Sequence, residues 1–153
     1  MTMNADKNNG PKNVSLKKHE VLCLEGDIET DLYVVEKGKL IVCLVKGTQV
    51  SPLAFIGPKE FIGEMSFFDK GPRSANIIAL EDCLLTKISS EEMYKSLPRW
   101  LISMGRTMAK RIRTTDEVIR GKGLKFANAE SMQPLSIEDQ RTYYLAITNK
   151  KKK

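Results

Sequence analysis

Residues 61–76 read FIGEMSFFDKGPRSAN and carry more information about this chain than any other segment. Gly63 and Glu64 precede one short helical turn, a Gly-Pro bend follows at 71–72, and Arg73 stands just ahead of a new strand. The free N–H groups at a helix start attract anions, and the planar guanidinium of Arg73 suits phosphate oxygens. Glu64 would repel a phosphate, but its carboxylate can accept hydrogen bonds from sugar hydroxyls. The segment therefore predicts a pocket for a phosphorylated sugar, which suggests a nucleotide.

Short strand-like runs, separated by glycine and proline turns, surround this segment. The expected strands are 21–24, 32–36, 40–45, 50–56, 74–80 and 83–88. Short strands joined by turns favour a small antiparallel roll over a parallel α/β sheet. At 153 residues, the chain fits one such domain with tails.

The pattern changes to a helical period after residue 88. A short helix is expected from Ser89-Ser90 to the stop at Pro98, and a long helix from 99 to 120. The apolar positions of the long helix recur every three or four residues: Leu101, Met104, Met108, Ile112, Thr115, Val118 and Ile119. Such a stripe packs on another helix, so we favour pairing with a second copy of the chain. Packing against the chain's own roll is the alternative.

Gly63-Glu64 and the run 72–75 resemble the phosphate-binding cassette of the cyclic nucleotide-binding domain, as found in catabolite activator proteins and protein kinase A regulatory subunits. The resemblance extends from about 14 to 119. It implies a mostly β fold with α: an antiparallel, jelly-roll-like β-roll with a cassette helix and C-terminal B and C helices. The expected organisation is a disordered tail at 1–13, the domain at 14–121, and a C-terminal tail at 122–153.

The resemblance also implies roles for individual residues. Glu64 would accept the ribose 2′-hydroxyl, Arg73 would hold the exocyclic phosphate oxygens, and Thr115 would contact the base amino group. The implied ligand-binding set is Gly63, Glu64, Met65, Ser66, Arg73, Ser74, Ala75, Asn76 and Thr115. Asn76 stands where many relatives carry Thr or Ser, which leaves the base preference open.

Catalytic and metal sites find little support. The chain has one histidine, His19, and no nucleophile elbow, Walker loop or zinc-protease motif. Its three cysteines, Cys23, Cys43 and Cys83, lie far apart in apolar runs, so we expect buried, reduced thiols and a cytoplasmic protein. We therefore expect no enzyme activity, no metal and no cofactor beyond the nucleotide ligand.

The last thirty residues lie outside the resemblance. A short helix is expected at 135–147, capped by Ser136, with Ile137, Tyr144, Leu145 and Ile147 forming its adhesive face. A helix this short is marginal alone, so it must dock on the roll or bind a partner. The lysines at 150–153 supply much of the net charge of +6 and are expected to be a solvated end.

These observations predict a sensor or adaptor that binds a cyclic nucleotide, with cAMP favoured and cGMP as the alternative. We expect a homodimer through the long helix and an effector protein as the downstream partner. Too few residues follow that helix for a DNA-binding winged helix, so no DNA contact is expected. A degenerate domain that binds a protein instead of a nucleotide is the second hypothesis, and membrane contact through the lysines is the least favoured.

Overall fold

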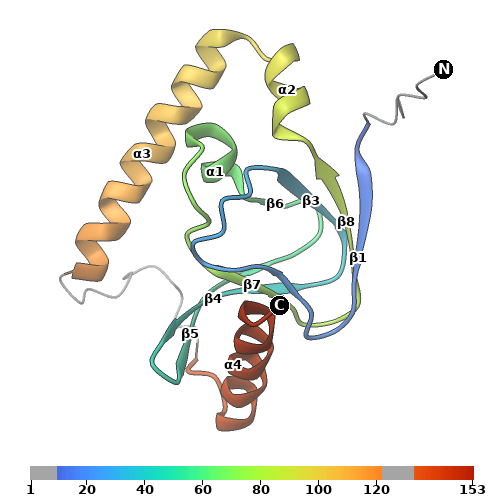
Figure 1. Ribbon diagram of the computed structural model, residues 1–153, viewed down its shortest axis with the longest axis vertical. Coiled ribbons are helices and arrows are strands. Elements are labelled where there is room, and N and C mark those ends of the chain that lie inside the picture. Colours follow the sequence, from blue (N-terminus) through green and yellow to red (C-terminus); the bar gives the residue numbers. More distant parts are fainter. Residues whose placement is uncertain (1–9, 122–132) are drawn as a thin grey trace.

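Two four-stranded antiparallel sheets form the body of the protein, as the computed structural model shows for residues 10–121 and 133–153 (Figure 1). One sheet has the strand order β1-β8-β3-β6 and the other β2-β7-β4-β5. The strands are β1 (Lys12–Leu16), β2 (Val21–Cys23), β3 (Leu32–Lys37), β4 (Leu40–Lys46), β5 (Gln49–Ile56), β6 (Phe61–Ile62), β7 (Asn76–Ala79) and β8 (Cys83–Ile88). The helices are α1 (Glu64–Asp69), α2 (Ser90–Ser96), α3 (Arg99–Gly121) and α4 (Ile137–Lys151). The predicted antiparallel β-roll with added helices is confirmed.

Strands β1 and β6 were not expected from the sequence. β1 is the polar run KNVSL, which pairs with β8 as an edge strand and so needs no continuous apolar stretch. It begins at Lys12, so the last two residues of the expected disordered tail belong to the sheet instead. Residues 1–9 of that tail lie outside the described residues, as does the linker 122–132.

The two faces of the second sheet bury different sets of side chains. Successive residues of a strand point to opposite faces, so Leu40 and Ile77 lie in the interior of the roll while Ile41 and Ile78 face outward. The interior cluster also contains Val35 and other fully buried aliphatic side chains. All three cysteines are buried and unpaired, as the sequence predicted. The outward cluster is covered by α4.

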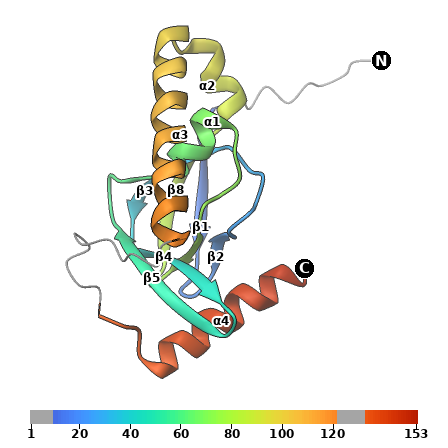
Figure 2. The ribbon, with the colours of Figure 1, turned by 90° about the vertical axis from the view of Figure 1, so that its left-hand side faces the viewer.

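Helix α4 docks on the outer face of the second sheet through Tyr143 and Ile147 (Figure 2). Ser136 caps its N-terminus by accepting a hydrogen bond from the Asp139 N–H at 3.0 Å. The predicted adhesive face was wrong in part, because Ile137 and Leu145 are exposed. Tyr143 and Ile147 lie four residues apart and share one face, whereas Leu145 points the opposite way.

The lysines at 150–153 are exposed, as expected, but the first of them also contacts the roll. The helix continues to Lys151, and the Lys150 ammonium donates to the carbonyls of Val21 at 2.5 Å and Leu22 at 3.2 Å. This lysine therefore ties the C-terminal helix to β2.

Helix α3 stands along one side of the roll and packs on α1 (Figure 1, Figure 2). Its inner face is lined by small residues: a Cβ on Gly105 would lie only 2.3 Å from the ring of Phe68, so glycine permits the close approach. The apolar stripe points away from the roll. Met104, Met108 and Ile112 are 48%, 54% and 51% exposed, so the stripe does not pack on the chain's own roll. None of the described helices is long and apolar enough to cross a bilayer.

Candidate functional site

A cavity of about 130 Å³ lies between the interior of the roll and the segment from Gly63 to Ala75. Its lining residues are Cys23, Val42, Ile56, Phe61, Ile62, Gly63, Glu64, Met65, Ser66, Arg73, Ser74, Ala75 and Ile77. Seven of the nine predicted site residues are therefore brought together: the run 63–66 and the run 73–75. The cavity combines an apolar wall with a few convergent polar groups, which is typical of a small-molecule site.

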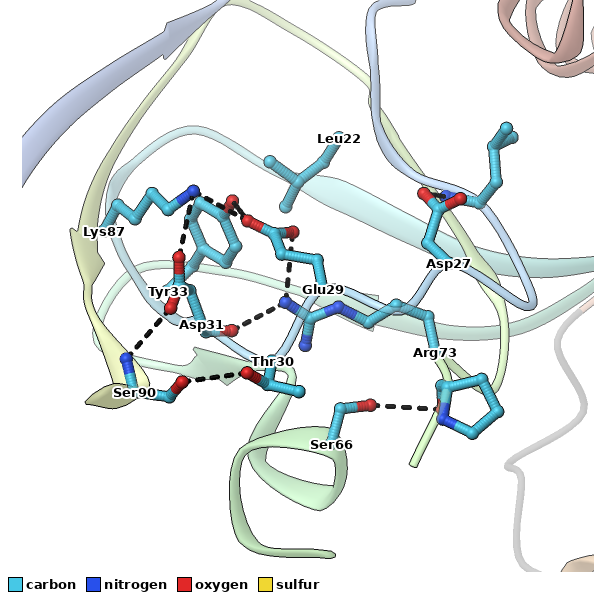
Figure 3. A network of polar contacts seen from close by, with 12 residues as sticks. Leu22, Asp27, Glu29, Thr30, Asp31, Tyr33, Ser66, Arg73, Lys87 and Ser90 are labelled. Atoms are coloured by element: carbon cyan, nitrogen blue, oxygen red, sulfur yellow. Dashed lines mark hydrogen bonds and ion pairs between the residues drawn. The ribbon is translucent and has the colours of Figure 1, made fainter. Parts of the chain in front are cut away.

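Arg73 is the cation of this cavity, and it is 4% exposed. Its Nη2 donates to the Asp31 carbonyl at 2.6 Å and lies 3.2 Å from the Glu29 carboxylate (Figure 3). Its Nε and Nη1 are buried and have no hydrogen-bond partner among the described residues. Buried donors without acceptors are rare and costly, so these two atoms suit an anionic ligand. The residues present therefore fit a phosphate group.

Gly63 makes room for this guanidinium. It has a left-handed backbone with φ of +88°, and a Cβ at this position would lie 1.7 Å from Arg73 Nη1. Any larger residue would therefore be strained and would push Arg73 out of place.

A polar network centred on Glu29 holds the guanidinium of Arg73 in place (Figure 3). The Glu29 carboxylate accepts hydrogen bonds from the Tyr33 hydroxyl at 2.5 Å and from the Lys87 ammonium at 2.7 Å. Lys87 also pairs with Asp31 at 3.1 Å. The network fixes Arg73 through Nη2 and leaves Nε and Nη1 without a partner among the described residues.

The charges in this network stabilise one another. Burial opposes ionisation of Glu29, but the hydrogen bonds from Lys87 and Tyr33 outweigh it and hold the pKa of Glu29 below its ordinary value. Burial also disfavours the charged form of Lys87, yet Glu29 and Asp31 raise its pKa. Sequence reasoning missed Glu29, Tyr33 and Lys87, and the acid-rich turn at 25–31 is the signal that could have pointed to them.

The other lining residues have simpler surroundings. Glu64 is exposed at the rim, where its carboxylate is open to a ligand hydroxyl. The Ser66 hydroxyl donates to the Pro72 carbonyl at 3.1 Å, which ties α1 to the residue before Arg73. Burial raises the pKa of the Cys23 thiol to about 11, so this wall of the cavity stays neutral.

Two predicted site residues are not brought to the cavity. The Asn76 amide is buried, donates to the Cys43 carbonyl at 3.3 Å and accepts from the Glu25 N–H at 3.1 Å, so it joins strands instead. Thr115 is exposed on α3, and its hydroxyl donates to the Arg111 carbonyl one turn earlier at 3.0 Å.

A larger, open hollow of about 510 Å³ lies beside α2. Its lining mixes carboxylates with lysines, and Lys87 and Asp31 within it already pair with each other. It contains no residue of the 61–76 segment. The smaller cavity is therefore the better candidate for a ligand site, because buried donors of Arg73 lack acceptors there.

The model of the cyclic nucleotide-binding domain family matches residues 13–98, more than half of the chain. The protein therefore belongs to the cyclic nucleotide-binding domain family. The Cyclic AMP receptor protein of Thermus thermophilus is 35% identical over 96 residues, which are 60% of this chain and 44% of that protein. The chain thus spans less than half the length of this relative.

Solved structures show the same similarity. The EAL enzyme Bd1971 in its cAMP-bound form has a TM-score of 0.60 and 29% identity, covering 73% of this chain and 31% of that one. Its cGMP-bound form has a TM-score of 0.59 and 30% identity, covering 70% and 30%. The Catabolite Activator Protein of Thermus thermophilus has a TM-score of 0.57 and 30% identity, covering 74% and 55%.

Proposed function

We propose that this protein binds a cyclic purine nucleotide, cAMP in the first place and cGMP as the alternative, and acts as a non-catalytic sensor. The observation that carries the proposal is the pair of buried, unpartnered donors on Arg73, a residue that lines the cavity together with Glu64. Arg73 would hold the phosphate, Glu64 would accept the ribose 2′-hydroxyl, and the apolar wall would receive the base. Similar structures with cAMP and cGMP bound support this ligand class.

The output of the sensor would pass through α3 to a protein partner. The exposed stripe of α3 contains Met104, Met108 and Ile112, and an apolar stripe of this length is typical of a helix that pairs with another helix. A second copy of the chain is the occupant we propose, with an effector protein acting on the paired form.

Calorimetric titration of nucleotide-free protein with cAMP, cGMP and linear 5′-AMP tests the ligand proposal. We expect saturable binding of a cyclic nucleotide and weaker binding of 5′-AMP, which carries an additional charge on its phosphate. The mass of any nucleotide that co-purifies gives an independent answer. Absence of binding by all three would contradict the proposal and favour the degenerate, protein-binding alternative.

A further inference from the structure

The inner face of α3 carries two arginines that contact the cassette on either side of Arg73. Arg113 and Arg120 lie seven residues apart, which is about two helical turns, so they project from one face about 10 Å apart along the axis. This face differs from the apolar stripe, because its two arginines are only partly exposed and contact the cassette.

Arg113 holds the segment that precedes Arg73. Its Nε and Nη2 form a two-pronged ion pair with the Asp69 carboxylate, and the Nη2–Oδ1 distance is 3.0 Å. The same carboxylate accepts from the Gly71 N–H at 2.8 Å. Arg113 Nη2 also lies 3.4 Å from the Ser66 hydroxyl, which donates to the carbonyl of Pro72. One arginine therefore fixes the end of α1 and the turn that leads to Arg73.

This arrangement leaves little space at the turn. A Cβ on Gly71 would lie 2.9 Å from Arg113 Nη2 and 3.0 Å from the Asp69 carboxylate. Only 5% of the Asp69 side chain is exposed, so the ion pair is shielded from solvent.

Arg120 holds the segment that follows Arg73. Its Nη2 donates to the Ser74 carbonyl at 3.0 Å, and its Nη1 donates to the Glu25 carboxylate at 3.1 Å. Asp116, one turn earlier on α3, lies 2.8 Å from Arg120 Nε and orients the guanidinium. Ser74 lines the cavity, so Arg120 reaches the wall of the site from outside.

We infer that Arg113 and Arg120 are positioning residues for nucleotide binding. They fix the backbone on both sides of Arg73, so that its free donors and the neighbouring cassette backbone meet the phosphate in one geometry. The backbone of Arg73 is itself paired with Asp27 and Gly26, which fixes the remaining side. Helix α3 thus supports the phosphate site without contacting the ligand through these arginines. The inference rests on the proposed function.

The test compares the cAMP affinity of the wild-type protein with the affinities of four variants. These are Arg113→Gln, Asp69→Asn, the double variant that combines these two changes, and Arg120→Gln. Each single variant should bind cAMP about 3- to 30-fold more weakly, since a residue that acts through another contributes modestly. Because Arg113 and Asp69 act as one unit, the double variant should lose no more than either single variant. Lys110→Gln, on an exposed position of the same helix, is the matched control and should bind like the wild type.

Urea unfolding of the same proteins without nucleotide separates positioning from simple stabilisation. Affinities are measured on protein that unfolding curves show to be folded, and Arg113→Lys, which keeps the charge, should recover part of the lost affinity. If Arg113→Gln does not fold, Arg120→Gln near the exposed end of α3 decides the question. Variants that lose stability but keep the wild-type affinity would overturn the inference. A wild-type protein that binds no cyclic nucleotide would overturn the proposed function together with it.

Discussion

Arg73 is a buried cation whose neighbours use only part of its hydrogen-bonding capacity. Glu29 and the Asp31 carbonyl both engage Nη2, while Nε and Nη1 keep their donors directed away from protein acceptors. Such an arrangement is rare in folded proteins, and the proposed phosphate would complete it. Three predictions concern single residues of this site.

Removal of Arg73 should cost most of the phosphate affinity. Arg73→Ala leaves a buried phosphate without its cation, and such truncations cost about 2–5 kcal/mol, roughly one and a half to three and a half orders of magnitude in affinity. Calorimetric titration with cAMP measures the loss. Arg99→Ala, at an exposed arginine at the start of α3, is the control. Equal affinities for Arg73→Ala and the wild type would place the phosphate elsewhere.

Glu64 should act on the ribose and not on the phosphate. Glu64→Gln should weaken the binding of cAMP more than that of 2′-deoxy-cAMP, because a hydrogen bond to a charged acceptor contributes about 1.5–3 kcal/mol and the deoxy ligand lacks the donor. Titration of the wild type and of Glu64→Gln with both ligands gives the coupling energy between the Glu64 carboxylate and the ribose 2′-hydroxyl. A matched loss for the two ligands would assign Glu64 a general electrostatic role.

The network around Glu29 should make the free energy of unfolding depend on pH. The pKa of Glu29 is lower in the folded state than in the unfolded state. Ionised Glu29 therefore stabilises the fold at pH values above its unfolded pKa of about 4.3, and this stabilisation is lost as the pH falls through the folded-state pKa. Urea unfolding should therefore show a smaller loss of stability between pH 7 and about pH 3 for Glu29→Gln than for the wild type. Glu91→Gln, at an exposed glutamate, should keep the wild-type dependence. An unchanged dependence in Glu29→Gln would exclude this role.

At the scale of elements, α4 depends on its contact with the roll. A fifteen-residue helix is marginal alone in water, and the anchors of α4 are Tyr143, Ile147 and the Lys150 bonds to β2. These anchors lie on one face, whereas Leu145 lies on the opposite face and is exposed.

Truncation of the buried anchor should release the helix. Ile147→Ala removes a side chain that is 1% exposed, and comparable core truncations cost about 2–5 kcal/mol. Hydrogen exchange should show faster exchange of the α4 amides in this variant. Leu145→Ala, on the opposite face of the same helix, is the control and should exchange as the wild type does. Equal protection in both variants would mean that Ile147 does not anchor α4.

At the scale of the whole molecule, the two faces of α3 have separate tasks. The inner face joins the cassette through Arg113 and Arg120, whereas the outer face exposes methionines and aliphatic side chains to solvent. A surface stripe of this kind is a candidate for association.

The outer face should mediate dimer formation. Met108→Glu would bury an unpaired charge in the paired stripe, so it should dissociate the dimer while the fold survives. Sedimentation equilibrium measures the association, and circular dichroism checks the fold. Thr114→Glu adds the same charge at an exposed position beside the stripe and should leave the dimer intact. A wild-type protein that is monomeric at high concentration would contradict this prediction.

Local patterns in the sequence were enough for the helices, for every strand except β1 and β6, and for the central residues of the cavity. Helix caps, glycine turns and the spacing of apolar residues depend on neighbours along the chain, so Gly63-Glu64, Arg73 and the start of α4 at Ser136 could be recognised before the fold was known. The family resemblance added Met65, Ser66, Ser74 and Ala75, which also line the cavity. Strand β1 was not predicted because an edge strand can be polar and so lacks an apolar pattern. The family resemblance placed Asn76 and Thr115 at the ligand, and neither lines the cavity.

Partners distant along the chain could be found only after the sheets had been brought together. Glu29 meets Arg73 across 44 residues and Lys87 across 58, and nothing in the local pattern specifies which acid approaches which base. The same holds for α4, whose docked face depends on which outward side chains the second sheet offers. Local propensity decides where an element begins and ends, whereas packing of non-local surfaces decides which of its faces becomes buried.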